Sequence, residues 1–513
     1  MRVESGNVQG NPAMRDFLMN RNVALALALL GLALAGQAQV PPAMPVDHVG
    51  AQRVARIPPL SHPRGDRWPL LLWGNGPEPG EELQAYLDRG LCPFFNSLLG
   101  REETIREALI PRLQQVRRNG FPLVILPQGH TQAMFMGPRV RNHLAPQGAK
   151  KVNHRFDCPA WLLDNPHLTG HGNSLRQKCE FLRSEGFTLD AVFIDFESGA
   201  YLRNGAEAEK PVRAAMAEAA KCPACTKRFD QTVLTTPEAF AAAVERGRAH
   251  AIRVTLSDPV HSVFPESRTG NFCAHAVSRL PKMPGMYPAH GYDGSGMTVP
   301  QPRQYFTAGW RGGGRDEGEV AWACMGDALR RFSPVAETLR DGELLIPWLG
   351  NVNSRNATRE KRGNAFCPAA GYAEIVRHVM LRGAETFALF VPHDPAKEYP
   401  EDYRVPYRER GPWLMVLQGV QAGYADMLRF HDFLRRAKPV TFSHPASYKK
   451  IDDDAFVWSG MATEDLALIR TITYRPAEHS EGITLFGKEI AVPFIAQGAF
   501  HWIRLDGSVE RIR

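Results

Sequence analysis

The sequence predicts an α/β fold, a (β/α)8 barrel followed by a small C-terminal β-sandwich-like domain. Short apolar runs alternate with helical patterns from residue 68 to about residue 395, which is typical of parallel strands joined by crossover helices. Eight such runs can be counted, as many as the barrel requires. Beyond residue 440 the pattern changes to short alternating segments separated by polar turns, as in a compact sandwich.

The expected barrel strands are short and apolar, and amphipathic stretches separate several of them. The strands are expected at 69–73, 122–126, 191–194, 251–256, 285–287, 304–307, 344–348 and 386–391. Two further segments, 133–136 and 160–163, are alternatives for the third strand. Helices are expected at 81–87, 102–118, 174–184, 237–248, 319–332 and 372–381. A helical stretch at 411–438 precedes the C-terminal strands, expected at 455–459, 465–474, 483–486, 490–494 and 499–505.

The first 38 residues predict a secretory signal peptide with an upstream extension. Arg21 precedes an apolar run at 23–35, and Gly36 and Ala38 supply the small residues that a signal peptidase requires. The run is shorter than the roughly 20 residues that span a bilayer, and no later segment is long and apolar enough to do so. We therefore expect an exported protein, periplasmic or extracellular, without an integral membrane segment in the mature chain.

The remaining chain is long enough for two domains, with the catalytic barrel in 60–440 and the small β domain in 441–513. The composition of the full sequence, 44% hydrophobic and 22% charged, is ordinary for a globular protein. The net charge of +7 permits attraction to an acidic glycan or anionic surface, but no nucleic-acid motif accompanies it. We expect a carbohydrate partner and no nucleic acid.

Eight cysteines, an even number, in an exported chain favour disulfides over thiols, although the sequence does not reveal their connectivity. Cys222-Pro-Ala-Cys225 looks like half of a zinc knuckle, but a tetrahedral zinc site needs a second close pair and the other cysteines are scattered. The sequence predicts neither a metal nor a cofactor.

The segment that carries most chemistry is Ala191-Val-Phe-Ile-Asp-Phe-Glu-Ser-Gly199, where an apolar strand runs into two carboxylates. Side chains alternate along a strand, so Asp195 and Glu197 point the same way, about 6.6 Å apart along the backbone. Repulsion between the two raises the proton affinity of one, which then serves as a general acid near neutral pH. Such a pair also occurs as a loop cap or a salt-bridged group, but the carboxyl ends of barrel strands are where active sites lie. We predict a glycosidase with Glu197 and Asp195 as catalytic residues.

Other strand ends supply polar and aromatic residues that suit a sugar. Flat aromatic faces pack against the CH groups of pyranoses, while amides and hydroxyls bind the OH groups. Each aromatic residue taken alone is more often part of a core. The candidate substrate-binding residues are Tyr287, Trp73, Asn75, Trp310, Trp348, Asn351, Asp258 and His393. No G-x-S-x-G elbow or phosphate-binding loop is present, which argues against serine hydrolase and nucleotide chemistry.

The chain resembles the barrel glycosidases that use substrate-assisted retention, the hyaluronidase and chitinase groups. The resemblance rests on Trp73-Gly-Asn75, on the acidic strand ending Asp195-Phe-Glu197, and on Met286-Tyr287-Pro288. It implies that Glu197 protonates the leaving oxygen, Asp195 orients the substrate acetamido group that acts as nucleophile, and Tyr287 hydrogen-bonds that group.

The chain also departs from these groups in two places. Chitinases have further aspartates before the acid, where this chain has Val192, Phe193 and Ile194. At the last strand it has Phe387 and Phe390 where those groups place tryptophan. A conventional glycosidase remains open, with Asp258, Asp293 or Asp394 as the partner carboxylate. Outside the enzymes, the alternative is a secreted, catalytically inactive glycan-binding or scaffold protein on the same barrel.

Overall fold

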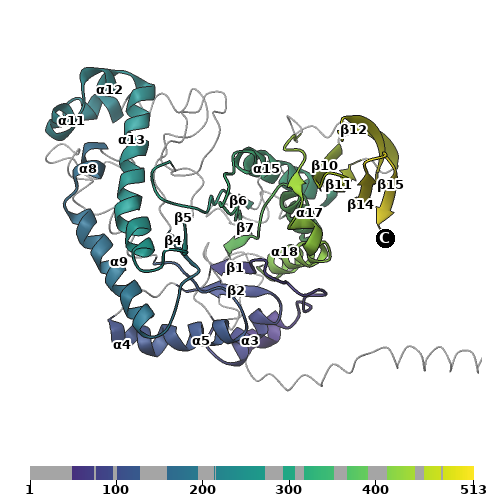
Figure 1. Cartoon of the computed structure of the whole chain (residues 1–513), viewed down its shortest axis with the longest axis horizontal. Helices are drawn as coiled ribbons and strands as arrows, with labels where there is room; N and C mark the ends of the chain where they lie inside the picture. Colours follow the sequence, from purple (N-terminus) through teal and green to yellow (C-terminus); the bar gives the residue numbers. More distant parts are fainter. Residues whose placement is uncertain are drawn as a thin grey trace, which may run out of the picture. The chain divides into compact units, whose positions relative to one another are not determined.

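The described part of the chain contains parallel strands followed by an antiparallel sheet (Figure 1). The computed structural model describes residues 49–73, 77–95, 101–127, 159–194, 213, 215–271, 293–306, 317–351, 367–390, 413–444, 456–474 and 478–512. All of them belong to one of the two units of the chain, His48–Arg513.

Eight short parallel strands can be followed through the described residues. They are β1 (Leu70–Trp73), β2 (Leu91–Phe94), β3 (Val124–Ile125), β4 (Ala191–Ile194), β5 (Arg268–Asn271), β6 (Arg303–Phe306), β7 (Trp348–Asn351) and β8 (Ala388–Phe390). Parallel ladders give the orders β2-β1-β8-β7-β6 and β3-β4-β5. Parallel bridges Phe95↔Ile125 and Gly270↔Val299 link these two sheets. The first joins the end of β2 to β3, and the second joins β5 to the segment that leads into β6.

The parallel sheet is strongly curved, because it brings together rings from strands that are not neighbours. The ring centroids of Phe94 in β2 and Trp348 in β7 lie 5.5 Å apart, although β1 and β8 lie between these strands. In a flat sheet two such strands would be roughly 14 Å apart. Trp73 and Phe390 lie on the same face by register; the Trp73 ring contacts that of Trp348, and the Phe390 ring contacts that of Trp73. We call this face the concave face.

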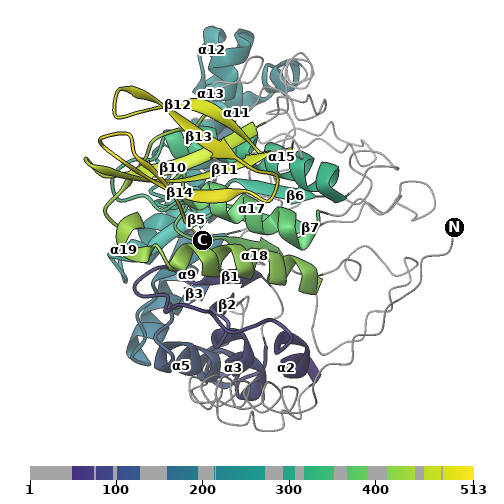
Figure 2. The same cartoon turned by 90° about the vertical axis from the view of Figure 1, so that its right-hand side faces the viewer.

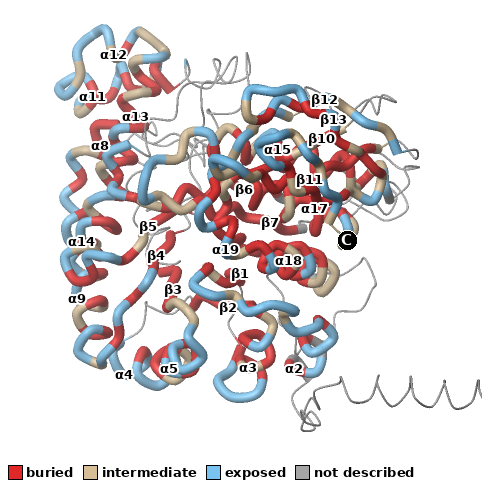
Figure 3. The backbone as a smooth tube through the Cα atoms, turned by 45° about the vertical axis from the view of Figure 1, so that its right-hand side comes forward, coloured by how far each residue is buried: buried red, intermediate tan, exposed pale blue. Residues whose placement is uncertain are grey.

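Helices connect the strands and carry the exposed outer surface (Figure 3). Before β4 they are α2 (Val49–Val54), α3 (Glu81–Leu87), α4 (Glu102–Thr104), the π-helical turn η1 (Ile105–Leu109), α5 (Ile110–Arg118), α8 (Pro159–Asp164) and α9 (His167–Ser184). After β4 they are α11 (Pro223–Arg228), α12 (Gln231–Thr235), α13 (Pro237–Ile252), the π-helical turn η3 (Arg253–Ser257), α14 (Asp258–His261), α15 (Glu317–Glu337), α17 (Ala369–Met380), α18 (Trp413–Leu428) and α19 (His431–Leu434). In the part of the chain that the structure describes, none of the helices has the length and apolarity to cross a bilayer.

Most predicted elements are confirmed, but the predicted strand 251–256 is wrong. These residues form the end of α13 and the turn η3. A short apolar run does not distinguish a strand from a buried helix, and the Thr255 hydroxyl is satisfied in the helix by donating to the Ala251 carbonyl at 2.6 Å. The alternative strand 160–163 lies in helix α8, while 133–136 and 285–287 lie outside the described residues.

The sequence did not predict β2 and β5. Pro93 interrupts the apolar pattern of β2, and the sequence of β5, Arg-Thr-Gly-Asn, has no apolar alternation. The predicted strand 344–348 begins earlier than β7, although Leu345 forms an isolated parallel bridge with Ala384.

The C-terminal part contains a five-stranded antiparallel sheet and a hairpin (Figure 2). The sheet has the order β15-β14-β11-β10-β9 and consists of β9 (Lys438–Pro439), β10 (Phe456–Ala462), β11 (Leu466–Thr473), β14 (Ala499–Arg504) and β15 (Val509–Ile512). The hairpin pairs β12 (His479–Leu485) with β13 (Lys488–Phe494). An apolar cluster joins the hairpin to one face of the sheet and includes Ala467, Ile469, Ile483, Val492, Phe494 and Ile503. On the other face Trp502 packs edge-on against Phe430 and Phe433 near α19.

Candidate functional site

Strand β4 leads directly into the predicted catalytic pair. Its four residues are buried, and it lies between β3 and β5. Phe94 is on the concave face, so the next residue, Phe95, is on the opposite face. Phe95 pairs with Ile125, and Ile125 pairs with Val192, so Val192 is also on the opposite face. Phe193 therefore lies on the concave face. Asp195 and Glu197 follow in the sequence but lie outside the described residues.

Several other predicted substrate-binding residues lie outside the described residues. These are Asn75, Tyr287, Trp310 and His393. The backbone of Asn351 ends β7, and its side chain is not described. Their predicted roles stay predictions.

The two described tryptophans of the predicted site pack against other rings. Trp348 is fully buried, and its ring meets those of Trp73 and Phe94 edge-on. Trp73 is 8% exposed and also packs edge-on against Phe390. A fully buried ring has no face to offer a sugar, so the structure gives Trp348 a packing role.

Asp258 was expected just past a strand, and this placement is wrong. It is the first residue of α14, exposed, and its Oδ1 lies 3.2 Å from Nε of Arg253. The residues before it are helical, so no strand directs its side chain toward the concave face.

The concave face contains two polar residues that the sequence analysis did not single out, Gln301 and Arg303. Arg303 is aligned with Trp348, and the bridge from Gly270 to Val299 puts Gln301 on the same face. A Cβ atom on Gly270 would lie 2.9 Å from Oε1 of Gln301, so the glycine makes room for this side chain. Gln301 is 2% exposed, and neither amide atom has a hydrogen-bond partner among the described residues. The predicted strand began at Gln304, so it did not include residues 299, 301 and 303, which share one face.

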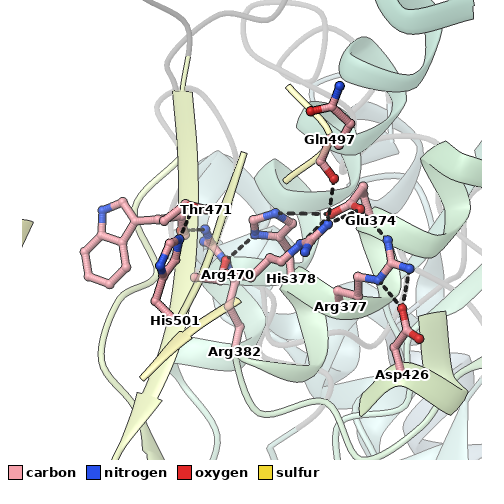
Figure 4. A network of polar contacts seen from close by, with 11 residues as sticks. Glu374, Arg377, His378, Arg382, Asp426, Arg470, Thr471, Gln497 and His501 are labelled. Carbon is pink, nitrogen blue, oxygen red and sulfur yellow. Dashed lines mark hydrogen bonds and ion pairs between the residues drawn. The ribbon is translucent and has the colours of Figure 1, made fainter. Parts of the chain in front are cut away.

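A second group of polar residues, most of them buried, lies where α17 meets the C-terminal sheet (Figure 4). We call it the polar network; its members are Glu374, Arg377, His378, Arg382, Asp426, Ser459 and Arg470. Glu374 accepts from Nε and Nη2 of Arg470 at 3.0 and 2.6 Å and also pairs with Arg377. Arg377 in turn donates from Nε to Asp426 at 2.9 Å. The carboxylates therefore have cationic partners on α17 and β11.

His378 is fully buried in the polar network. Ser459 Oγ accepts from Nε of Arg382 at 2.9 Å and is hydrogen-bonded to Nδ1 of His378, also at 2.9 Å. Burial, together with the positive charges of Arg382, Arg470 and Arg377, lowers the pKa of His378 well below its usual value. The network joins two parts of the fold, with its centre buried and Asp426, whose side chain is 44% exposed, at its edge.

The described residues include no group of three or more His, Cys, Asp and Glu side chains that could hold a metal ion. The structure joins none of the six described cysteines in a disulfide; Cys158 and Cys273 lie outside the described residues. Disulfide bonding in the mature protein therefore stays a prediction.

Comparison with known proteins gives distant structural likenesses. No family model and no curated protein matches the chain. Eubacterium rectale Amy13B is 9% identical, with 88% of this chain and 98% of that chain covered and a TM-score of 0.41. The endo-β-1,4-mannanase from Thermotoga petrophila is 10% identical, with 88% and 97% covered and a TM-score of 0.37. The GH27 β-L-arabinopyranosidase from Geobacillus stearothermophilus is 9% identical, with 80% and 79% covered and a TM-score of 0.36. These scores lie below 0.5, so we draw no conclusion about fold or activity from them.

Proposed function

We propose that the eight parallel strands form a closed (β/α)8 barrel. Each strand is parallel to the next along the chain, and β8 is parallel to β1, which is the strand order of such a barrel. Trp73 aligns in turn with Phe94, Val124, Ala191 and Arg268 through these parallel pairings.

We propose further that the protein is an exported glycoside hydrolase with its active site at the carboxyl ends of these strands. One observation carries the proposal, the position of the carboxylate pair immediately beyond the buried strand β4. Phe193 faces the concave side, and the period of two along a strand predicts the same side for Asp195 and Glu197. In a barrel this side opens to substrate beyond the strand ends.

In the proposed reaction Glu197 donates a proton to the leaving oxygen of the glycosidic bond. Repulsion between two carboxylates this close disfavours ionisation of both, so Glu197 keeps its proton while Asp195 is ionised. Its negative charge stabilises the positive charge that develops at the anomeric carbon, directly or by orienting a substrate acetamido group as nucleophile. Water then completes hydrolysis with Glu197 acting as base.

Reducing-end release from a panel of polysaccharides, with and without N-acetylhexosamines, tests the proposal. Glu197→Gln is expected to lower kcat at least 10³-fold while leaving the melting temperature unchanged. Glu266→Gln is a matched control, because Glu266 is an exposed carboxylate in the turn before β5, at the opposite ends of the strands. Equal activity in Glu197→Gln and wild type would exclude Glu197 as the acid. Tight binding to a glycan without release would favour the inactive binding protein.

A further inference from the structure

Two buried cysteines face each other between helices α15 and α17. Cys324 lies in α15, and Cys367 comes immediately before Pro368, the N-cap of α17. They are 3% and 0% exposed, and Cys324 is near enough to Cys367 to help raise the pKa of its thiol. These two residues are far apart in the sequence, so tertiary packing alone brings them together.

The packing around the two thiols is tight. A Cβ atom on Gly371 would lie 3.0 Å from Sγ of Cys367 and 3.1 Å from the backbone of Ala321 in α15. Tyr372 is fully buried beside them and packs edge-on against Phe306 of β6, with the ring centroids 5.6 Å apart. Helix α18 closes the same region, because a Cβ atom on Gly419 would lie 2.9 Å from Cβ of Tyr372. These contacts hold α15 and the start of α17 in place, so the two sulfur atoms stay adjacent.

We propose that Cys324 and Cys367 are joined by a disulfide in the mature protein. The bond would connect α15 to the residue just before the N-cap of α17 and would close a loop containing β7. Such a cross-link removes conformational freedom from the unfolded chain more than from the folded one. The proposal is independent of any glycosidase activity.

The reaction requires an external oxidant, which we take to be a low-molecular-weight or protein disulfide. The thiolate of one cysteine attacks the external disulfide, which forms a mixed disulfide and releases one thiolate. The second cysteine, as thiolate, then attacks the protein sulfur of the mixed disulfide and releases the other external thiolate. Two protons leave the cysteines, two electrons reduce the external disulfide to two thiols, and one sulfur–sulfur bond forms in the protein.

Burial determines when this reaction takes place. Burial and the neighbouring Cys324 raise the pKa of the Cys367 thiol well above its usual value. Because the thiolate is the reactive form, the folded thiols react slowly. The bond therefore forms during folding, while the cysteines are still exposed to the oxidant.

Peptide mapping tests the pairing directly. The unfolded, reduced chain is refolded in a glutathione redox buffer, remaining thiols are alkylated, and the protein is digested with trypsin without reduction. Tryptic peptides 316–330 and 363–377 each contain one cysteine, and we expect them as one linked species. Adding glutathione disulfide to the folded, reduced protein should form the same link at least 100-fold more slowly. Both peptides alkylated at full yield after refolding, or Cys324 linked to a different cysteine, would overturn the proposal.

A thermal comparison separates the cross-link from general damage to the core. Each protein is melted with and without prior reduction, so that the effect of a substitution on packing cancels. Reduction should lower the melting temperature of wild type on the order of 5 °C. The shift should be smaller in Cys324→Ala and Cys367→Ala, and by the same amount in both. Cys179→Ala is the control for loss of a buried thiol, because Cys179 is a fully buried cysteine on α9. A shift in Cys367→Ala as large as that of wild type would contradict the proposed bond.

Discussion

The concave face of the parallel sheet and the polar network at α17 are both largely buried, but one consists of aromatic rings and the other of charged and polar groups. On the concave face Trp73, Phe94, Trp348 and Phe390 meet edge-on, and this packing requires complementary shape. In the polar network charged groups are satisfied only if each partner is present and aligned. The first region should therefore respond to loss of volume, and the second to loss of one partner or to a change of pH.

The largest effect is expected from Trp348→Ala. The substitution leaves a cavity among rings contributed by several strands, and it should lower the free energy of unfolding by about 3–5 kcal/mol. Trp348→Phe keeps an aromatic ring and should lose less. Urea unfolding followed by circular dichroism measures both variants. A loss below about 1 kcal/mol for the alanine variant would mean that the rings do not form a packed core.

In the polar network, Glu374→Gln should cost about 3 kcal/mol, because it leaves Arg470 and Arg377 buried without their shared negative charge. Replacing Glu374 and Arg470 together by methionine should recover part of the loss. A double-mutant cycle built from the free energies of urea unfolding gives the interaction energy between Glu374 and Arg470. Purely additive losses would show that the two side chains do not act as a pair.

A glycine beside the polar network gives a smaller effect. Gly498 has φ of 69°, and a Cβ atom there would overlap the guanidinium of Arg470. Gly120 has φ of 70° but no atom within 4 Å of that position, so Gly120→Ala measures the backbone strain alone. We expect about 1 kcal/mol for Gly120→Ala and about 2 kcal/mol for Gly498→Ala in thermal unfolding. Equal losses would mean that Arg470 adjusts without cost.

The smallest effect on stability is expected from a change of pH. The pKa of His378 is low in the folded protein, whereas in the unfolded chain it is about 6.5. Below that value the unfolded state binds a proton that the folded state excludes, so stability falls as the pH falls, by about 1.4 kcal/mol per pH unit. His501 adds to this fall down to its folded pKa of about 4, which burial lowers. Urea unfolding at several pH values measures this dependence. In His378→Gln the free energy of unfolding should fall less steeply with pH between pH 6.5 and 5 than in wild type. An equal fall in both proteins would mean that a group other than His378 binds the proton.

The sequence by itself predicted the elements whose pattern is local. The apolar run 191–194 is strand β4 at the predicted residues, and 81–87 is helix α3, because burial on a sheet or on one helix face requires a fixed apolar period. Only the tertiary structure decided the rest. It made 251–256 helical, although the apolar run had predicted a strand, and it brought Phe94 beside Trp348 by curving the sheet. It also placed Gln301 over Gly270 and Cys324 against Cys367. These contacts depend on strand register and on the packing of segments far apart in the sequence. The apolar period of a single segment contains no information about either.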